Sequence, residues 1–307
     1  MAAQKNAPLP DGLSVAGYCI VKTIACGGFS IVYLARDGDG NAVAIKEYLP
    51  SELALRGPGA LVPLITAANA PLFRLGLRCF FDEARALALV KHPNVVRALD
   101  FFRANHSAYL VMAYEPGHTL QEHIARRRAN GTKMREAWIV STFIEVINGL
   151  RAVHAHKLLH LDLKPANILL RPGGQPVLLD IGGMRQSAAV QLTGRAVMPT
   201  VTPAFAAPEL HGGSPGPWSD AYSIGATMFA CMVGAPPQPA NERYIEDRTD
   251  ASLVGVAGIY SAPLADLVRW CLRLDALARP QSLLALQLRL RLNRVVIARD
   301  LARCVVL

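Results

Sequence analysis

The sequence predicts an α+β fold in which a small part built of antiparallel strands is followed by a larger, mostly helical part. Apolar runs at residues 18–24, 31–35 and 42–45 are typical of strands, and the D-G-D-G-N turn before the third run favours a hairpin. After Pro116-Gly117 the periodicity becomes helical. Hydrophobic residues make up 52% of the 307 residues, which is ample for a sizeable core.

The remaining elements follow from the same patterns. Residues 80–90 have helical spacing, and the four prolines at 50, 58, 63 and 71 indicate an irregular insertion over 50–76. Further strands are expected at 95–102, 108–113, 168–170 and 177–179, and further helices at 119–128, 136–156, 223–235 and from 283 onward. We expect a flexible leader over 1–17, a small lobe over 18–114, a large lobe over 115–292 and a tail helix over 293–307.

The charge balance favours acidic partners. The net charge is +9, from 32 Lys and Arg against 23 Asp and Glu. The arginines are scattered through helical segments, and no basic run is interleaved with stacking aromatic residues. We therefore expect a solvated basic surface and no nucleic-acid partner.

The cysteines and apolar runs bear on location. None of the six cysteines shares a C-x-x-C spacing, which argues against zinc and against a disulfide framework. The longest apolar stretch, residues 223–235, is shorter than the ~20 residues that span a bilayer. We expect a cytoplasmic protein with no transmembrane segment.

The stretch HLDLKPANILL, residues 160–170, concentrates polar groups suited to phosphate chemistry. Asp162 can accept a proton from a hydroxyl, Lys164 can neutralise a phosphoryl group, and Asn167 can hold a divalent cation. A hairpin of strands 168–170 and 177–179 would return Asp180 close to Asn167. An acid and an amide at neighbouring strand ends suit Mg²⁺.

Other candidate residues are weak when taken singly. The turn IACGGFSIVYLA, residues 24–35, can bring backbone N–H groups close to phosphates, but it also fits an ordinary glycine hairpin. Lys46 ends a β-branched run, and Glu83 lies in the helical stretch FFDEARAL. Each alone is typical of a surface charge.

Taken together and in this order, the motifs resemble a protein kinase catalytic domain of the bacterial, eukaryotic-like serine/threonine type over residues 18–290. The matching motifs are the glycine-rich loop, Val43-Ala44-Ile45-Lys46, Glu83, the loop from His160 to Asn167, Asp180-Ile181-Gly182, Ala207-Pro208-Glu209, Asp220 and Arg279. The resemblance implies a bilobal fold whose small lobe is an antiparallel sheet with one main helix and whose large lobe is mostly helical.

The resemblance also implies ATP and Mg²⁺, with Mn²⁺ as an alternative, and Ser/Thr hydroxyls of proteins as acceptors. Lys46 would bind the α- and β-phosphates and pair with Glu83, while Asp162 would be the catalytic base and Lys164 would stabilise the γ-phosphate. Asn167 and Asp180 would hold the metal, and Arg279 would pair with Glu209. The implied nucleotide-binding residues are Ala25, Gly27, Gly28, Ser30, Val32, Ala44, Lys46, Met112, Ala113, Tyr114, Glu115 and Leu169.

The sequence departs from the family pattern at several motifs. Of the three glycine positions of the loop, Ala25, Gly27 and Ser30, only the middle one is glycine, which suggests modest nucleotide affinity. Leu161 replaces the arginine of H-R-D, which in the family contacts a phosphate on the activation loop. Our hypothesis is that activity does not require phosphorylation at Ser187, Thr193 or Thr200.

Three functions stay open: an active protein kinase, a pseudokinase that binds nucleotide as a scaffold, and a small-molecule phosphotransferase. The 50–76 insertion fits a regulatory docking loop or a tolerated surface insertion equally. The alternating leucines after residue 285 leave a strand open, although their position favours a helix that packs on the large lobe or docks a partner. The final C-V-V-L also matches a prenylation box, as four residues do by chance.

Overall fold

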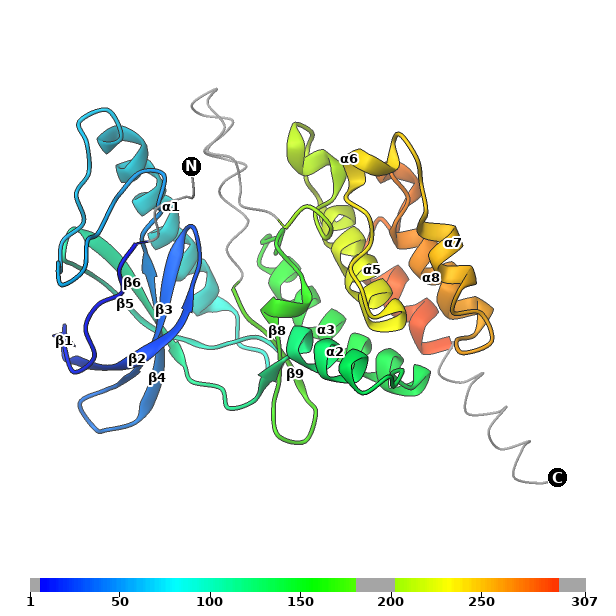
Figure 1. Ribbon diagram of the computed structural model, residues 1–307, viewed down its shortest axis with the longest axis horizontal. Coiled ribbons are helices and arrows are strands. Elements are labelled where there is room, and N and C mark those ends of the chain that lie inside the picture. The colour runs from blue at the N-terminus through cyan, green and yellow to red at the C-terminus, as the bar shows by residue number, and fades with distance from the viewer. Residues whose placement is uncertain (1–5, 181–201, 293–307) are drawn as a thin grey trace. The chain divides into compact units, whose positions relative to one another are not determined.

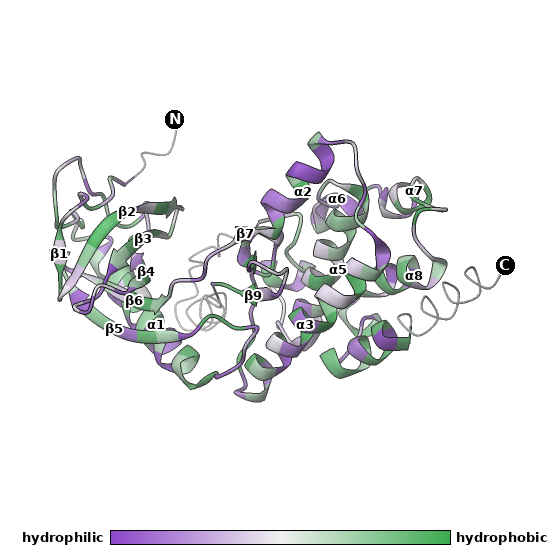
Figure 2. Ribbon diagram, turned by 90° about the horizontal axis from the view of Figure 1, so that it is seen from below, coloured by the Kyte–Doolittle hydropathy of each residue, from purple (hydrophilic) through white to green (hydrophobic). Residues whose placement is uncertain are grey.

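The computed structural model describes residues 6–180 and 202–292, which form two compact units. The first unit holds the described chain up to Lys91 together with Val96–Glu115, and the second holds His92–Val95 and the described chain from Pro116 onward. Figure 1 labels most of the elements of each unit. Figure 2 shows hydrophobic residues in the sheet of the first unit and in the helices of the second.

The first unit is built on an antiparallel sheet of six strands in the order β1-β2-β3-β4-β6-β5. The strands are β1 (Ser14–Val15), β2 (Tyr18–Cys26), β3 (Ser30–Arg36), β4 (Ala42–Tyr48), β5 (Ala98–Ala104) and β6 (Ser107–Ala113). The expected turn between β3 and β4 is present, and the Asp37 carboxylate closes it by accepting N–H bonds from Asp39 and Asn41, at 3.0 and 2.8 Å. The strands predicted for this part of the chain are confirmed.

Strand β4 presents two different faces. Val43, Ile45 and Glu47 alternate on one face and are buried. Tyr48 lies on the other face, against helix α1 (Ala70–Leu89), where its ring centroid is 5.2 Å from that of Phe73. A Cβ at Gly76 of α1 would collide with the Tyr48 hydroxyl, so this glycine permits the close approach of helix and strand.

Two expectations for this unit are wrong. Helix α1 begins at Ala70 rather than at residue 80, so the end of the 50–76 insertion is helical, and Pro71 lies in the first turn, where proline is tolerated. The expected flexible leader packs on the sheet from Asn6 onward. Leu9 is 1% exposed and donates its N–H to the Tyr33 hydroxyl at 3.1 Å, and Asn6 donates to the carbonyl of Leu49 at 3.1 Å.

The second unit combines a small sheet with helices that cover one another. Its sheet has the order β7-β8-β9, and its long central helix α5 contacts α3, α7 and α8. The strands are β7 (His118–Thr119), β8 (Ile168–Leu170) and β9 (Pro176–Leu178). The helices are α2 (Leu120–Ala129), α3 (Glu136–Ala155), α5 (Pro217–Val233), α6 (Ala240–Arg243), α7 (Thr249–Val254) and α8 (Ala262–Cys271).

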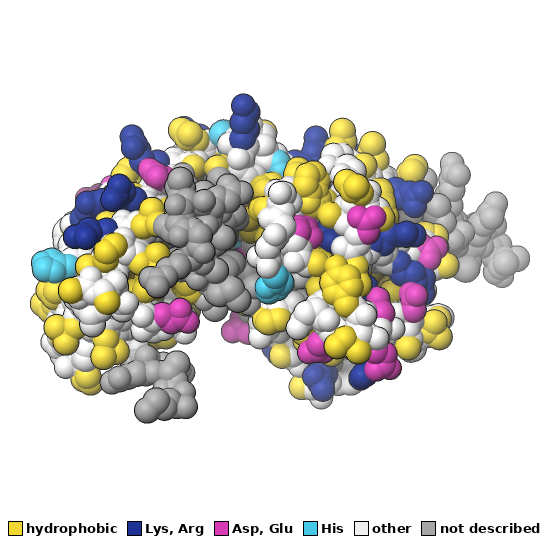
Figure 3. Space-filling model, turned by 90° about the horizontal axis from the view of Figure 1, so that it is seen from above, with side chains coloured by type: hydrophobic (Ala, Val, Ile, Leu, Met, Phe, Trp, Pro, Cys, Tyr) yellow, Lys and Arg dark blue, Asp and Glu magenta, His cyan; other side chains and the backbone are white. Residues whose placement is uncertain are grey.

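The predicted helices of this unit are present, although α5 begins at Pro217, six residues before the predicted start at 223, and α5 is buried over nearly its whole length. Residues 283–292 are helical, as favoured, and the tail from 293 lies outside the described residues. None of the helices described is both long and apolar enough to cross a bilayer. Lys and Arg side chains are spread over the face drawn in Figure 3, with Asp and Glu between them.

Candidate functional site

The loop that begins at His160 is tied to helix α5 by one buried carboxylate. Asp220 accepts the backbone N–H of His160 at 2.9 Å and that of Leu161 at 2.8 Å, and its Oδ2 lies 2.7 Å from Nε2 of His154. Burial alone would raise the pKa of Asp220, but these contacts with His154 and the loop hold it below its ordinary value. The ionised Asp220 therefore fixes a loop in which Leu161 has a φ of 57°.

Three of the predicted residues meet at this loop. Nζ of Lys164 lies 2.7 Å from Oδ2 of Asp162. Nδ2 of Asn167 donates to the backbone carbonyl of Asp162 at 2.8 Å and to its Oδ2 at 3.1 Å. The side chains of Asp162 and Lys164 are 22% and 20% exposed, so the carboxylate is held in a fixed place but stays within reach of a substrate.

The hairpin of β8 and β9 brings Asp180 beside this group. Ile168 pairs with Leu178, and the N–H of Leu179 donates to the carbonyl of Asn167 at 2.8 Å. Asp180 follows directly and has a φ of 51°. The return of Asp180 to Asn167 is the arrangement that the hairpin length predicts.

The oxygen atoms at this strand end fit Mg²⁺. Nδ2 of Asn167 is used for hydrogen bonds to Asp162, which leaves its Oδ1 as an acceptor, and Asp180 adds a carboxylate. Within the described residues, no group of three or more His, Cys, Asp and Glu side chains could hold a metal. A magnesium ion at Asn167 and Asp180 would take its other ligands from phosphate and water, as this ion usually does.

Lys46 and Glu83 belong to the first unit. Lys46 lies on β4, and its Nζ is 6.0 Å from the ring centroid of Phe80 on helix α1. Glu83 follows Phe80 by three residues on the same helix, so both lie on one side of α1. Strand β4 thus directs Lys46 toward the helix that carries Glu83.

The residues expected to bind nucleotide form rows across the sheet. Ala25 pairs with Val32, and Val32 pairs with Lys46, so these three residues cross β2, β3 and β4 in one row. Ala44 pairs with Met112 on β6. The turn between β2 and β3 carries Gly27 and Gly28, and Ser30 begins β3.

The chain leaves the sheet at three residues that were expected to bind nucleotide. Ala113 ends β6, and Tyr114, which is 40% exposed, and Glu115 follow it to the end of the first unit. Gly117 has a φ of 152°, and a Cβ there would collide with the carbonyl of Leu170. Leu169 pairs with Thr119 in the small sheet of the second unit.

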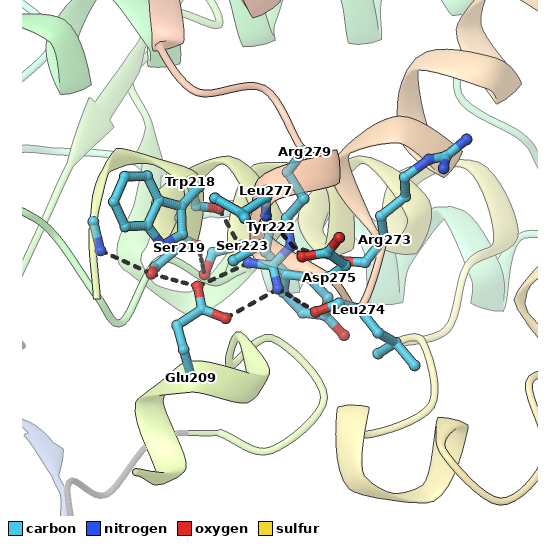
Figure 4. A network of polar contacts seen from close by, with 12 residues as sticks. Glu209, Trp218, Ser219, Tyr222, Ser223, Arg273, Leu274, Asp275, Leu277 and Arg279 are labelled. Carbon is cyan, nitrogen blue, oxygen red and sulfur yellow. Dashed lines mark hydrogen bonds and ion pairs between the residues drawn. The ribbon is translucent and has the colours of Figure 1, made fainter. Parts of the chain in front are cut away.

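The pairing of Glu209 with Arg279 is confirmed (Figure 4). The guanidinium donates from Nη1 to Oε1 of Glu209 at 2.8 Å and from Nη2 to Oε2 at 3.0 Å. The Ser219 hydroxyl donates to the same carboxylate at 2.6 Å, and the backbone carbonyls of Arg273 and Leu274 accept from Arg279. Each charged side chain thus has a partner of opposite charge. The pair connects the turn that carries Glu209, before α5, to Arg279, which follows α8 in the chain.

A buried ion pair in the first unit was missed by the sequence analysis. Arg56 and Glu47 are 2.6 Å apart, and both side chains are 0% exposed. The signal was the alternation of β4, because Glu47 continues the buried series of Val43 and Ile45.

Several predictions fall outside the described residues. Ile181 and Gly182 of the metal-binding motif do so, as do the three hydroxyl residues Ser187, Thr193 and Thr200. The tail beyond residue 292, with its C-V-V-L end, also lies outside. These predictions stay as predictions.

Comparison with known proteins agrees with this geometry. The model of the protein kinase domain family matches residues 18–289. The chain is 33% identical over 274 residues to the serine/threonine-protein kinase PknK of Mycobacterium tuberculosis, covering 88% of this chain but only 22% of PknK. It is 33% identical over 237 residues to serine/threonine-protein kinase 16 of Mus musculus, covering 72% of this chain and 70% of that protein.

Solved structures agree as well. The structure described as "PpkA-294 apo form" superposes with a TM-score of 0.79 at 31% identity, covering 92% of this chain and 99% of that one. The PknI kinase domain of Mycobacterium tuberculosis shares the fold, with a TM-score of 0.68 at 20% identity and coverage of 94% and 100%. The predicted bilobal α+β fold is confirmed. The chain belongs to the protein kinase domain family.

Proposed function

We propose that this protein transfers the γ-phosphoryl group of ATP, with Mg²⁺ or Mn²⁺, to Ser/Thr hydroxyls of proteins in the cytoplasm of a bacterium, as part of signalling. The observation that carries the proposal is the group formed by Asp162, Lys164 and Asn167, in which both nitrogen side chains lie within 3.1 Å of the Asp162 carboxylate. The names of the relatives, serine/threonine-protein kinases, support the same substrate class.

Each residue then has a chemical role. Asp162 accepts the proton of the acceptor hydroxyl as its oxygen forms a bond to the γ-phosphorus, while the bond from that phosphorus to the bridging oxygen breaks and ADP leaves. Lys164 offsets the negative charge that develops on the transferring group. Lys46, oriented by Glu83, holds the α- and β-phosphates. A magnesium ion on Asn167 and Asp180 would supply charge neutralisation to the phosphates.

The transfer of label from [γ-³²P]ATP with Mg²⁺ tests this proposal. Asp162→Ala is expected to lower transfer to a hydroxyl-rich protein by about 10²- to 10⁴-fold, the usual contribution of general base catalysis. Asp266→Ala removes an exposed carboxylate elsewhere in the second unit and is the matched control. ATP binding by the wild type without transfer would instead favour the pseudokinase, and transfer to small alcohols alone would favour the phosphotransferase.

Leu161 supports independence from activation-loop phosphorylation as part of the proposal. Its side chain is apolar and 4% exposed, so it cannot make the charged contact that the family arginine makes with a phosphate. The triple variant Ser187→Ala, Thr193→Ala, Thr200→Ala is expected to keep wild-type transfer. Loss of transfer in a variant with an unchanged circular dichroism spectrum would reject this part.

Input from a regulatory partner completes the proposal. The 50–76 segment carries exposed apolar side chains at Leu61, Val62 and Leu64, and the tail beyond residue 292 is the other candidate for docking. Leu64→Asp is expected to change transfer in cell extract but not with purified protein. Equal transfer by variant and wild type in both settings would argue against docking at Leu64.

A further inference from the structure

The glycine-rich loop between β2 and β3 accepts hydrogen bonds from the segment that follows β4. We call residues 49–69 the brace segment. The N–H of Leu49 donates to the carbonyl of Phe29 at 2.9 Å. Ser51 donates two hydrogen bonds to the carbonyl of Gly28, one from its N–H at 2.8 Å and one from its hydroxyl at 3.1 Å. Two successive loop carbonyls thus face the brace segment.

This contact sets the direction of an amide in the loop. In a trans peptide the C=O and the next N–H point in opposite directions, and the structure has no cis peptide in its described residues. Because the Gly28 carbonyl points to Ser51, the N–H of Phe29 points away from the brace segment. Backbone N–H groups at such turns are the groups that bind phosphate oxygens.

The brace segment is anchored by Arg56. Its guanidinium donates to both carboxylate oxygens of Glu47, at 2.6 and 2.7 Å, to the Tyr33 hydroxyl at 2.9 Å and to the carbonyl of Ala7 at 2.8 Å. The Tyr109 hydroxyl donates to the same carboxylate at 2.7 Å. Burial alone would lower the pKa of Arg56, but Glu47 raises it above its ordinary value. Arg56 therefore keeps its charge, and its bonds to Glu47 join the brace segment to the strand that carries Lys46.

The far end of the brace segment is fixed as well. The side-chain amide of Asn69 donates to the carbonyls of Glu52 and Leu53, both at 3.3 Å, directly before α1 begins. The brace segment thus connects three parts of the first unit: the glycine-rich loop, the face of β4 that carries Glu47, and the start of α1. All of these contacts lie within the first unit.

We propose that Ser51 is a positioning residue for the nucleotide phosphates and that Arg56 acts through it by holding the brace segment in place. The proposal rests on the proposed function, since it concerns the nucleotide of that reaction. An amide that already points toward its ligand loses less freedom on binding, which strengthens the complex. The loop keeps only one of the three family glycines. We expect hydrogen bonds from the brace segment to matter for phosphate binding in such a loop.

Nucleotide binding to the full chain provides the test. Ser51→Ala removes the hydroxyl bond and keeps the N–H bond. It is expected to weaken ATP binding, measured by calorimetry, by about two- to tenfold, the equivalent of one net hydrogen bond. Adenosine binding should not change, because adenosine has no phosphate. In steady-state kinetics, KM for ATP should rise with kcat unchanged. Ser14→Ala on β1 is the matched control and should behave as wild type.

Arg56→Lys keeps the positive charge but removes the planar set of guanidinium N–H donors. Like Ser51→Ala, it should weaken the binding of ATP and leave the binding of adenosine unchanged. Because Arg56 acts through Ser51, the double variant should bind ATP no more weakly than Arg56→Lys alone. Equal losses for ATP and adenosine, or no loss in Ser51→Ala, would overturn this inference while leaving the proposed function intact. A wild type that binds no ATP would overturn both.

Discussion

The ammonium of Lys164 and the carboxylate of Asp162 lie 2.7 Å apart, and the amide of Asn167 donates to the same carboxylate oxygen at 3.1 Å. Both donors come from the same short loop and its 3₁₀ turn, Pro165–Asn167. The Asp162 carboxylate is therefore oriented by its own loop, and the loop is oriented by Asp220 of α5. This order of support indicates which substitutions should affect catalysis and which should affect stability.

Removal of Lys164 should impair the chemical step. Lys164→Ala leaves Asp162 with its bond from Asn167 but takes away the cation that would face the transferring phosphoryl group. We expect kcat to fall by about 10²-fold or more, because charge stabilisation of this kind is worth that much in active sites. Steady-state kinetics measures it, with the exposed Lys91→Ala as control. A kcat within twofold of wild type would contradict the assigned role.

Removal of the Asn167 amide should change the dependence on metal. Asn167→Ala loses the amide oxygen that would bind the metal, together with both bonds to Asp162. The Mg²⁺ concentration that gives half-maximal transfer should rise about tenfold or more, in line with losses at metal sites. A magnesium titration of transfer measures this shift. Asn130→Ala, at the end of α2, should leave the titration unchanged.

The buried Asp220 should make part of the stability depend on pH. Its folded pKa lies below its ordinary value of 3.8, so its contribution is complete above that value and is lost as the pH falls through the folded pKa. Asp220→Asn replaces the charged acceptor of the His160 and Leu161 N–H groups with a neutral amide and should cost about 1.5–3 kcal/mol at pH 7, the contribution of a hydrogen bond to a charged group. Urea unfolding at several pH values should show the gap between variant and wild type narrowing below pH ~4. If the difference in the free energy of unfolding between variant and wild type stayed constant down to the lowest pH measured, this would argue against an ionised Asp220.

The buried pair of Glu209 and Arg279 should contribute more to the free energy of unfolding than the exposed ion pairs of the same unit do. The side chain of Arg279 is 0% exposed and that of Glu209 is 10% exposed, so Arg279→Ala leaves a poorly solvated carboxylate. We expect a loss of about 3–5 kcal/mol in the free energy of unfolding. Arg269→Ala removes exposed pairs with Asp250 and Asp266 and should cost about 1 kcal/mol or less. Chemical denaturation compares the two variants, and equal losses would contradict this reasoning.

The crossing of α5 and α8 should depend on a glycine. A Cβ at Gly225 of α5 would collide with the side chain of Cys271 on α8. Alanine favours helices by about 1 kcal/mol over glycine, but overpacking costs about 1–3 kcal/mol, so Gly225→Ala should lower the melting temperature. Gly38→Ala has open space around its new methyl group and should leave the melting temperature unchanged within about one degree. A melting temperature for Gly225→Ala at or above that of wild type would show that the helices adjust.

Local patterns were sufficient where the relevant residues are close in the chain. The strands from Tyr18 to Tyr48 were predicted because apolar alternation and turn residues act over a few positions. The start of α1 was placed too late, because Pro71 was counted as part of a loop although proline fits a first helical turn. The leader was misjudged because its few apolar residues, such as Leu9, are buried only by partners far along the chain.

The order of the motifs can be read from the sequence, and so can the short chain distance between Asp162, Lys164 and Asn167, since at most five peptide units separate them. The burial of Arg56 together with Glu47 and the contact of Ser51 with Gly28 depend instead on how the folded chain packs. The alternation of β4 places Glu47 on the buried face, but a charged residue has no local signature that identifies the partner with which it is paired. Its state depends on a partner brought by the fold, and that partner's distance along the chain carries no local signal.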